Sequence, residues 1–363
     1  MTDRQFPCNQ CGADVKFAPG QEALQCPYCG HLNDVPVDDE VAVPELDFRA
    51  HLDAARAASE VVETMVVDCP SCGAETTLAE GVVADECPFC GSSLVRTAHA
   101  ERIIKPQAVL PFRVTDREAR AAFGKWVKGL WFAPNKVKEF AREEGGLSGM
   151  YIPYWTYDSD TTTRYSGQRG DYYYTTQRYT TVEDGKTVTK TRQVRHTRWR
   201  SASGTVRNVF DDVLVPGSTS LPRKLLDALE PWDLDALAPY DDAYLSGFRA
   251  EAYAVNLEAG FRQAQEIMAV SIDQTIRRDI GGDEQRIHRK NTDYRAITFK
   301  HILLPVWVSA YRFDDKVYRF IVNARTGEVK GERPWSWIKI TLAVIVVLII
   351  AAVVYFVTQG QSM

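Results

Sequence analysis

All eight cysteines of this 363-residue chain fall into four C-x-x-C pairs, a spacing typical of metal ligands. The pairs form two modules, and each cysteine of the first has a counterpart in the second at one constant offset along the chain. Glycine, alanine and proline positions around the cysteines repeat at the same offset, so the modules are an internal duplication. The cysteines are Cys8, Cys11, Cys26 and Cys29 in the first module and Cys69, Cys72, Cys87 and Cys90 in the second.

Each module has the sulfur atoms for one tetrahedral metal site. A C-x-x-C turn directs two thiolates to one side, and two such turns complete an S₄ shell at Zn–S distances of about 2.3 Å. The segment between the turns, 12–25 in the first module, is long enough for a short hairpin. We therefore expect two zinc ribbons whose folding depends on the metal, with disulfides, free thiols and iron as the alternatives. Four protein ligands leave no open position, which makes each zinc structural, and His31 is expected to be a surface residue.

The expected cellular compartment of the protein agrees with zinc binding by the cysteines. The N-terminal segment 1–20 has no apolar run of the kind found in a secretory signal, so the cysteines are expected in a reducing cytoplasm. Since all eight cysteines belong to the modules, the sequence leaves none for catalysis.

The net charge of the chain and of each module indicates which class of partner the modules contact. The formal net charge of the chain is −5, and two zinc–thiolate sites would bring it to about −9. Residues 66–95 hold five acidic residues and no lysine or arginine, and residues 1–33 have a net charge of −1. Because nucleic-acid phosphates would be repelled, we expect the modules to contact proteins.

The C-terminal region carries an uninterrupted run of uncharged residues, Ile340–Val357. As a helix this run is about 27 Å long, which nearly matches a hydrocarbon core of about 30 Å. Trp335 and Trp337 stand where interfacial aromatic residues occur, and the basic residues Lys330, Arg333 and Lys339 precede the span. The sequence thus predicts a single-pass anchor in the inner membrane, with the preceding residues on the cytoplasmic side.

A basic and aromatic hairpin is predicted from Tyr172–Val182 and Thr187–Arg198 around the turn 183–186. Residues 161–210 have a net charge of +7 and interleaved tyrosines, and residues 211–260 have a net charge of −7. Arg192, Arg195 and Arg198 are candidate contacts for an anionic ligand. Pairing with the acidic segment, attraction to anionic lipid and binding of nucleic acid are three alternatives, of which nucleic acid is not expected.

Local patterns predict the remaining elements. Thr115 and Glu118 form a capping box for a helix to about Leu130, and Asn256 caps a helix ending at about Ile280 before two glycines. Short helices are expected at 221–230 and 232–237, and two strands at 303–311 and 317–322. The expected organisation is α+β: 5–33 first ribbon, 34–65 linker with a short helix, 66–95 second ribbon, 96–335 α+β cytosolic domain, 336–358 transmembrane anchor and 359–363 tail. The ribbons are expected to be separable modules.

Catalytic patterns are missing from the sequence. Gly124 and Gly129 have P-loop spacing, but Leu130 and Trp131 follow where lysine and a hydroxyl residue are required. No G-x-S-x-G, G-x-G-x-x-G or H-E-x-x-H occurs, and acidic pairs such as Asp211–Asp212 are expected on a solvated surface. An enzymatic function is therefore not expected, although a site assembled from dispersed residues would leave no motif.

Nearly the whole chain resembles a bacterial family of tail-anchored double zinc-ribbon membrane proteins. The resemblance rests on the two cysteine modules, the aromatic segments Tyr151–Tyr157, Leu304–Trp307 and Tyr318–Asn323, the residues Gly331–Pro334 and the terminal span, in that order. Members often carry a name borrowed from a replication helicase, primosomal protein N-prime, but the missing P-loop argues against that activity here.

The resemblance implies SPFH/flotillin-like and phage-shock-protein-A-like partners. Together with the composition and the motifs, it favours a non-enzymatic adaptor that uses two structural zinc ribbons and an α+β domain to recruit cytosolic proteins to the membrane. The alternative is a membrane-tethered nucleic-acid-binding protein that uses the hairpin 161–210.

Overall fold

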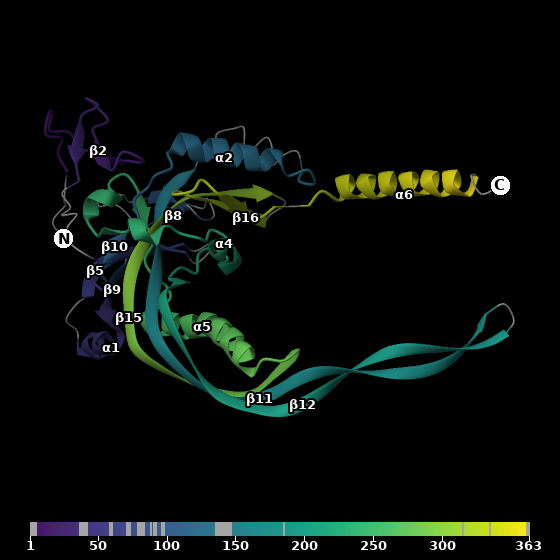
Figure 1. The fold of residues 1–363 in the computed structure, drawn as a ribbon. Helices are drawn as coiled ribbons and strands as arrows, with labels where there is room; N and C mark the ends of the chain where they lie inside the picture. The colour runs from purple at the N-terminus through teal and green to yellow at the C-terminus, as the bar shows by residue number, and fades with distance from the viewer. Residues whose placement is uncertain are drawn as a thin grey trace.

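The computed structural model describes residues 6–35, 43–57, 61–69, 74–77, 84–87, 89, 93–95, 99–134, 147–183, 186–313, 316–333 and 335–360. Within them the chain is a mixture of helices and a large, mainly antiparallel sheet (Figure 1), which confirms the α+β class. The helices are α1 Phe48–Ala57, α2 Asp116–Lys128, α4 Arg223–Asp227, α5 Leu257–Ile280 and α6 Trp337–Gly360, with 3₁₀ turns η1 Leu234–Ala236 and η2 Asp242–Leu245. The strands are β1 Lys16–Ala18, β2 Ala23–Gln25, β3 Leu32–Asp34, β4 Leu46–Asp47, β5 Val61–Asp68, β6 Glu75–Thr77, β7 Ala84–Glu86, β8 Ser93–Val95, β9 His99–Ile104, β10 Ala108–Val109, β11 Ser148–Glu183, β12 Lys186–Pro216, β13 Ala238–Pro239, β14 Arg249–Ala250, β15 Glu284–Phe313, β16 Lys316–Asn323 and β17 Val329–Gly331.

Three very long strands form the frame of the molecule. β11 pairs antiparallel with β12 on one side and with β15 on the other, and β15 continues into a hairpin with β16. β-branched and aromatic residues are frequent along these strands, as a pleated surface favours. The two strands expected at 303–311 and 317–322 are confirmed as the β15–β16 hairpin.

Both faces of the sheet are buried near its β10 end. Tyr151 and Leu303 belong to one hydrophobic cluster, whereas the adjacent Ile152 and Leu304 belong to another. Because successive strand residues point to opposite faces, these clusters lie on opposite faces of the sheet. We call the side of Tyr151 face A and the side of Ile152 face B.

Two predicted helices cover face A. α2 has the predicted capping box at Thr115, and its Phe123 stacks on Phe320 of β16 with ring centroids 3.9 Å apart. α5 begins after the cap Asn256, ends at Gly281 and buries Phe261 among its core residues. The segments 221–230 and 232–237 form shorter helices than expected, α4 and η1, around Pro222 and Pro231, which lack a backbone N–H.

The two cysteine modules pack against this sheet. In the first module Phe17 belongs to the face A cluster, and its N–H donates to Ser246 O at 3.0 Å. In the second, Cys69, Cys87 and Phe89 belong to the face B cluster. The expectation of separable modules is thus wrong, because each module has an apolar side that is buried against one face of the sheet.

The segment 34–65 also differs from a simple linker. It contains the expected short helix, α1, but Leu46 and Asp47 pair with β15, and β5 already begins at Val61. Phe48 is buried against the ring of Phe261, with centroids 4.8 Å apart. This aromatic contact ties the segment to the domain, because it removes apolar surface from water.

The predicted basic hairpin projects from the sheet as an arm. β15 accompanies β11 only to the pair Gly170–Glu284, so residues 171–183 and 186–198 form a ribbon of two strands, which we call the arm. At about 3.3 Å per residue, each strand of the arm spans about 43 Å. Tyr172 pairs with Thr197 and Val182 with Thr187, which confirms the hairpin predicted around residues 183–186.

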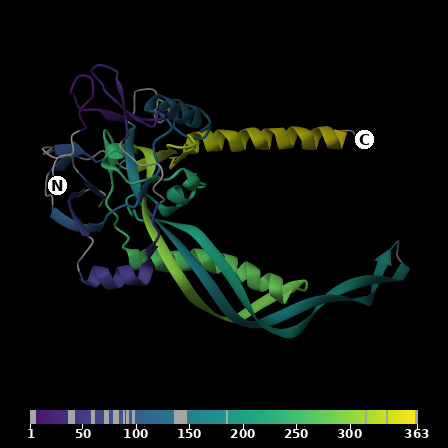
Figure 2. The same ribbon diagram turned by 60° about the vertical axis from the view of Figure 1, so that its left-hand side comes forward.

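α6 leaves the body beside β17 and α2 (Figures 1 and 2). Its segment Trp337–Tyr355 has a mean hydropathy of 2.8, and none of it is buried by the rest of the chain. It is therefore one apolar C-terminal helix long enough to cross a membrane. In both views the arm extends on the same side of the body as α6.

Candidate metal centre

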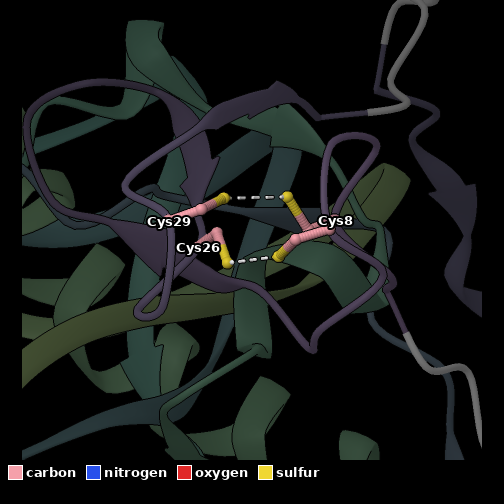
Figure 3. A group of neighbouring side chains, drawn as sticks. Cys8, Cys26 and Cys29 are labelled. Carbon is pink, nitrogen blue, oxygen red and sulfur yellow. Dashed lines mark hydrogen bonds between the residues drawn. The ribbon is translucent and has the colours of Figure 1, made fainter.

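The four cysteines of the first module converge on one point (Figure 3). The Sγ atoms of Cys8 and Cys29 are 3.6 Å apart, those of Cys11 and Cys26 are 3.5 Å apart, and all four lie within 4.8 Å of one another. A tetrahedral zinc ion with Zn–S bonds of about 2.3 Å would separate its sulfur ligands by about 3.8 Å. The thiols therefore fit a tetrahedral thiophilic ion.

Backbone turns hold each pair of thiols in position. The N–H of Gly12 donates to Cys8 O at 2.9 Å, and the N–H of Gly30 donates to Cys26 O at 3.0 Å. Both glycines have positive φ, 76° and 75°, which a residue with a Cβ rarely adopts. These two glycines therefore close the C-x-x-C turns of the first module.

Asn33 on β3 connects the first C-x-x-C turn to β2. Its side-chain oxygen accepts the N–H of Asn9 at 2.8 Å, and its Nδ2 lies 3.3 Å from Leu24 O and 3.9 Å from Cys8 Sγ. Asn33 is buried, so these bonds are shielded from water. Such second contacts orient metal ligands. The sequence analysis did not identify Asn33, whose counterpart in the second module is Leu94.

The thiols of the first module differ in their affinity for protons. Burial raises the pKa of the Cys8 thiol, but the backbone N–H groups of Gln10 and Cys11 outweigh this effect. The pKa is lowered to about 6. At Cys29 the N–H of His31 lowers the pKa, whereas partial desolvation and the neighbouring cysteines raise it to about 12. Four thiolates this close repel one another, so a bound cation is required to deprotonate them all.

The second module repeats the backbone of the first. The N–H of Cys69 donates to Ala74 O at 2.8 Å, as that of Cys8 donates to Ala13 O at 2.8 Å. β7 and β8 follow β2 and β3 at the same offset that relates the cysteines, and their registers are the same. Cys69 and Cys87 are buried in one cluster. Cys72 and Cys90 lie outside the described residues, as do the glycines that follow them.

His31 follows the first module, and its side chain is exposed, which confirms that it is a surface residue. Around it, Tyr28 is 82% exposed and Cys11 and Cys29 are exposed, whereas Cys8 and Cys26 are buried. The first module therefore presents one side to the domain and the other to solvent.

The three candidate arginines lie on the arm and do not join the cysteines. Arg192 lies over the ring of Tyr179, Arg195 over Tyr172 and Arg198 over Tyr173, at 5.7, 4.3 and 5.2 Å from the ring centroids. Each arginine thus has an aromatic partner on the arm itself. Each arginine covers one face of its tyrosine ring, and a stacked base would need such a face.

A second charged cluster lies where β11, β12 and β15 bend. Lys300 Nζ is 2.8 Å from Asp212 Oδ1 and 3.1 Å from Glu45 Oε1, and Asp158 Oδ2 accepts the Thr298 hydroxyl at 2.7 Å. Glu45, Asp158 and Asp211 bring carboxylate oxygens within 4.8 Å of one another. Lys300 supplies the positive charge for this cluster, so we interpret it as an ion-pair network around a buried lysine whose carboxylate partners are partly exposed.

The solvated surface expected for Asp211–Asp212 is therefore wrong for Asp212. A β-bulge gives Asp212 a φ of +49° and directs its side chain to the Lys300 cluster. Burial, together with the nearby Glu45 carboxylate, raises the pKa of Asp158, although hydrogen bonds and Lys300 oppose this shift. No short-range pattern joins residues 45, 158, 212 and 300, which is why the sequence analysis missed them.

Comparison with known proteins identifies a relative that matches nearly the whole chain. The chain is 26% identical over 349 residues to the uncharacterized protein YdjG of Bacillus subtilis (strain 168), a match that covers 91% of this chain and 90% of that protein. No protein-family model matches the chain, and the search of solved structures found no match.

Proposed function

We propose that this protein is a non-enzymatic, single-pass membrane adaptor with two structural zinc sites. The observation that carries the proposal is the separation of its two exposed surfaces. The first module, marked by β2, lies on the opposite side of the body from α6 in both views (Figures 1 and 2). With α6 in a bilayer, the exposed side of that module faces away from the membrane, where a cytosolic protein can reach it.

Zinc has a structural role in this proposal. The four thiols of the first module leave no ligand position for water or substrate, so the ion would hold the C-x-x-C turns in place. The repeated backbone of the second module supports an equivalent site there. Because the modules pack on opposite faces of one sheet, the metals would also stabilise the domain on which they dock.

Membrane insertion places the body on the cytoplasmic side. The basic residues Lys330, Arg333 and Lys339 precede the span, which favours retention of that end in the cytoplasm. The arm extends on the same side as α6, but a ribbon with two open edges cannot enter hydrocarbon. We therefore expect the arm to bend near Gly170, where it loses its third strand, and to remain in water.

Partners of the SPFH/flotillin-like or phage-shock-protein-A-like classes are part of the proposal, as the resemblance implies. Affinity capture of the detergent-solubilised full-length protein from its own membranes, after nuclease treatment, tests this. Recovery of such proteins supports the adaptor. Recovery of replication proteins alone, or of material lost with nuclease, would instead support the nucleic-acid alternative.

A substitution of Tyr28 makes the same experiment more specific. It lies on the exposed side of the first module and is absent from the hydrophobic clusters. Tyr28→Ala should lower partner recovery and leave the zinc content unchanged. The matched control is Val209→Ala on β12, which removes another highly exposed apolar side chain at a distance from the cysteines. Equal recovery from both variants would exclude the exposed side of the first module as the docking surface.

A further inference from the structure

The turn that follows α2 carries aromatic residues between two buried anchors. Leu130 and Ala133 belong to the face A cluster, whereas Trp131 between them is 79% exposed and Phe132 is 37% exposed. The turn is closed by bonds from Leu130 N to Val127 O at 3.1 Å and from Ala133 N to Leu130 O at 3.3 Å. Exposing large aromatic side chains on a turn held this firmly is costly in water, which suggests a role for them.

Hydrogen bonds join this turn to the beginning of α6. The N–H of Ser336 donates to Phe132 O at 2.7 Å, and Lys339 Nζ donates to Ala133 O at 2.7 Å. The end of α2 and the start of α6 accordingly lie next to each other in Figure 1. The turn after α2 and the beginning of α6, which are far apart in the sequence, are thus held against each other.

The junction borders an open apolar hollow of about 430 Å³. Phe132 and Trp335 line one side, and the other is a stripe on α6 that runs from Ile340 through Val344 to Leu348. At about 1.5 Å per residue this stripe extends about 12 Å, so the hollow continues well into the apolar run. Among the described residues, those that line it carry no charge, whereas Lys125 and Lys128 are in the last turn of α2 and Arg333 lies over the ring of Trp335.

We propose that this junction is a second membrane contact, in which Phe132 and Trp335 hold a lipid acyl chain against α6 and Trp131 lies in the interfacial layer. The inference rests on the proposed insertion of α6. The occupant is lipid because the hollow is continuous with the exposed apolar surface of α6, and the nearby lysines and arginine suit phosphate headgroups. The contact sets the orientation of the body on the membrane, which a single helix alone would leave free to rotate.

Fluorescence quenching in nanodiscs tests the contact with the full-length protein. The nanodiscs contain phosphatidylcholine and phosphatidylglycerol, with bromine on the acyl chains near the headgroup as the quencher. Phe132→Trp should increase the fraction of tryptophan emission that is quenched. Tyr174→Trp adds a tryptophan at an exposed position of the arm and should not increase that fraction.

Trp131→Phe should remove about a third of the quenched emission, because Trp131 would share the interface with Trp335 and Trp337. Quenching that is present in the wild type but is unaltered by both Phe132→Trp and Trp131→Phe would overturn the second contact and leave the anchor intact. A wild-type protein without any quenching would overturn membrane insertion itself. Unchanged zinc content and circular dichroism verify that each variant is folded.

Discussion

The N–H of Cys69 donates to the carbonyl oxygen of Ala74 at 2.8 Å, the bond that Cys8 and Ala13 form in the first module. Together with the identical strand registers, this bond shows that the duplication includes backbone structure as well as cysteine spacing. The modules differ in their surroundings, since the first contacts face A of the sheet and the second contacts face B. Their metals should therefore be separable by mutation.

We predict that the full-length protein binds two zinc ions and that Cys8→Ser and Cys69→Ser each reduce the content by one. Each substitution should also destabilise the domain, because Cys8 lies within the face A core and Cys69 within the face B core. Atomic emission gives the zinc content, and thermal unfolding followed by circular dichroism gives the stability. A wild type with one zinc ion would eliminate the second site. A variant that loses zinc but unfolds at the temperature of the wild type would contradict a structural role for the ion in that module.

Removing the positive charge from the Lys300 cluster should be strongly destabilising. The Lys300 side chain is 8% exposed and lies between Glu45 and Asp212, so Lys300→Met leaves carboxylates together without their cation. The expected loss is about 1–3 kcal/mol in the free energy of unfolding, because the carboxylates that lose their partner are partly exposed to water. The control is Lys290→Met, whose partner Asp273 is on the surface and whose loss should cost about 0–1 kcal/mol. Urea unfolding measures both, and similar losses would show that burial does not strengthen the Lys300 pairs.

His301 should make the domain sensitive to acid. Its side chain is 2% exposed, and burial lowers its pKa to about 4 even though Nδ1 contacts Ile104 O at 2.8 Å. An unfolded histidine has a pKa of about 6.5, so the unfolded state binds the proton more tightly. Stability should consequently fall as the pH drops from about 6.5 to 4, by up to about 3 kcal/mol.

Urea unfolding at several pH values measures this contribution. His301→Asn should flatten the pH dependence in that window even if it lowers stability overall. His288→Asn alters an exposed histidine and should leave the dependence unchanged. A His301→Asn variant with the slope of the wild type would assign the acid sensitivity to other groups.

Neutralising the arm should not affect nucleic-acid binding, because we expect none. The triple variant Arg192→Gln, Arg195→Gln and Arg198→Gln removes the arginines stacked on the arm tyrosines. Fluorescence anisotropy with single-stranded DNA, over a range of salt concentrations, compares it with the wild type. A second triple variant, at the exposed Arg262, Arg277 and Arg278 of α5, is the control for net charge. Salt-sensitive binding lost only in the arm variant would establish the nucleic-acid alternative.

Features encoded over a few residues could be predicted from the sequence. The capping box at Thr115, the cap at Asn256 and the hairpin around residues 183–186 depend on bonds between near neighbours, and all are confirmed. The convergence of Cys8, Cys11, Cys26 and Cys29 follows from spacing in the same way. α6 is recognisable because length and hydropathy are properties of one segment. In each case the physical cause lies within the segment itself.

Relationships between distant segments could not be predicted in this way. The docking of the modules on opposite faces, the pairing of Lys300 with Asp212 and the contact of Phe132 with the start of α6 each join surfaces separated by many residues. The type of an apolar or charged residue indicates that it needs a partner when it is buried, but many surfaces can provide one. The partner is selected by the fit of surfaces that form only when the chain has folded.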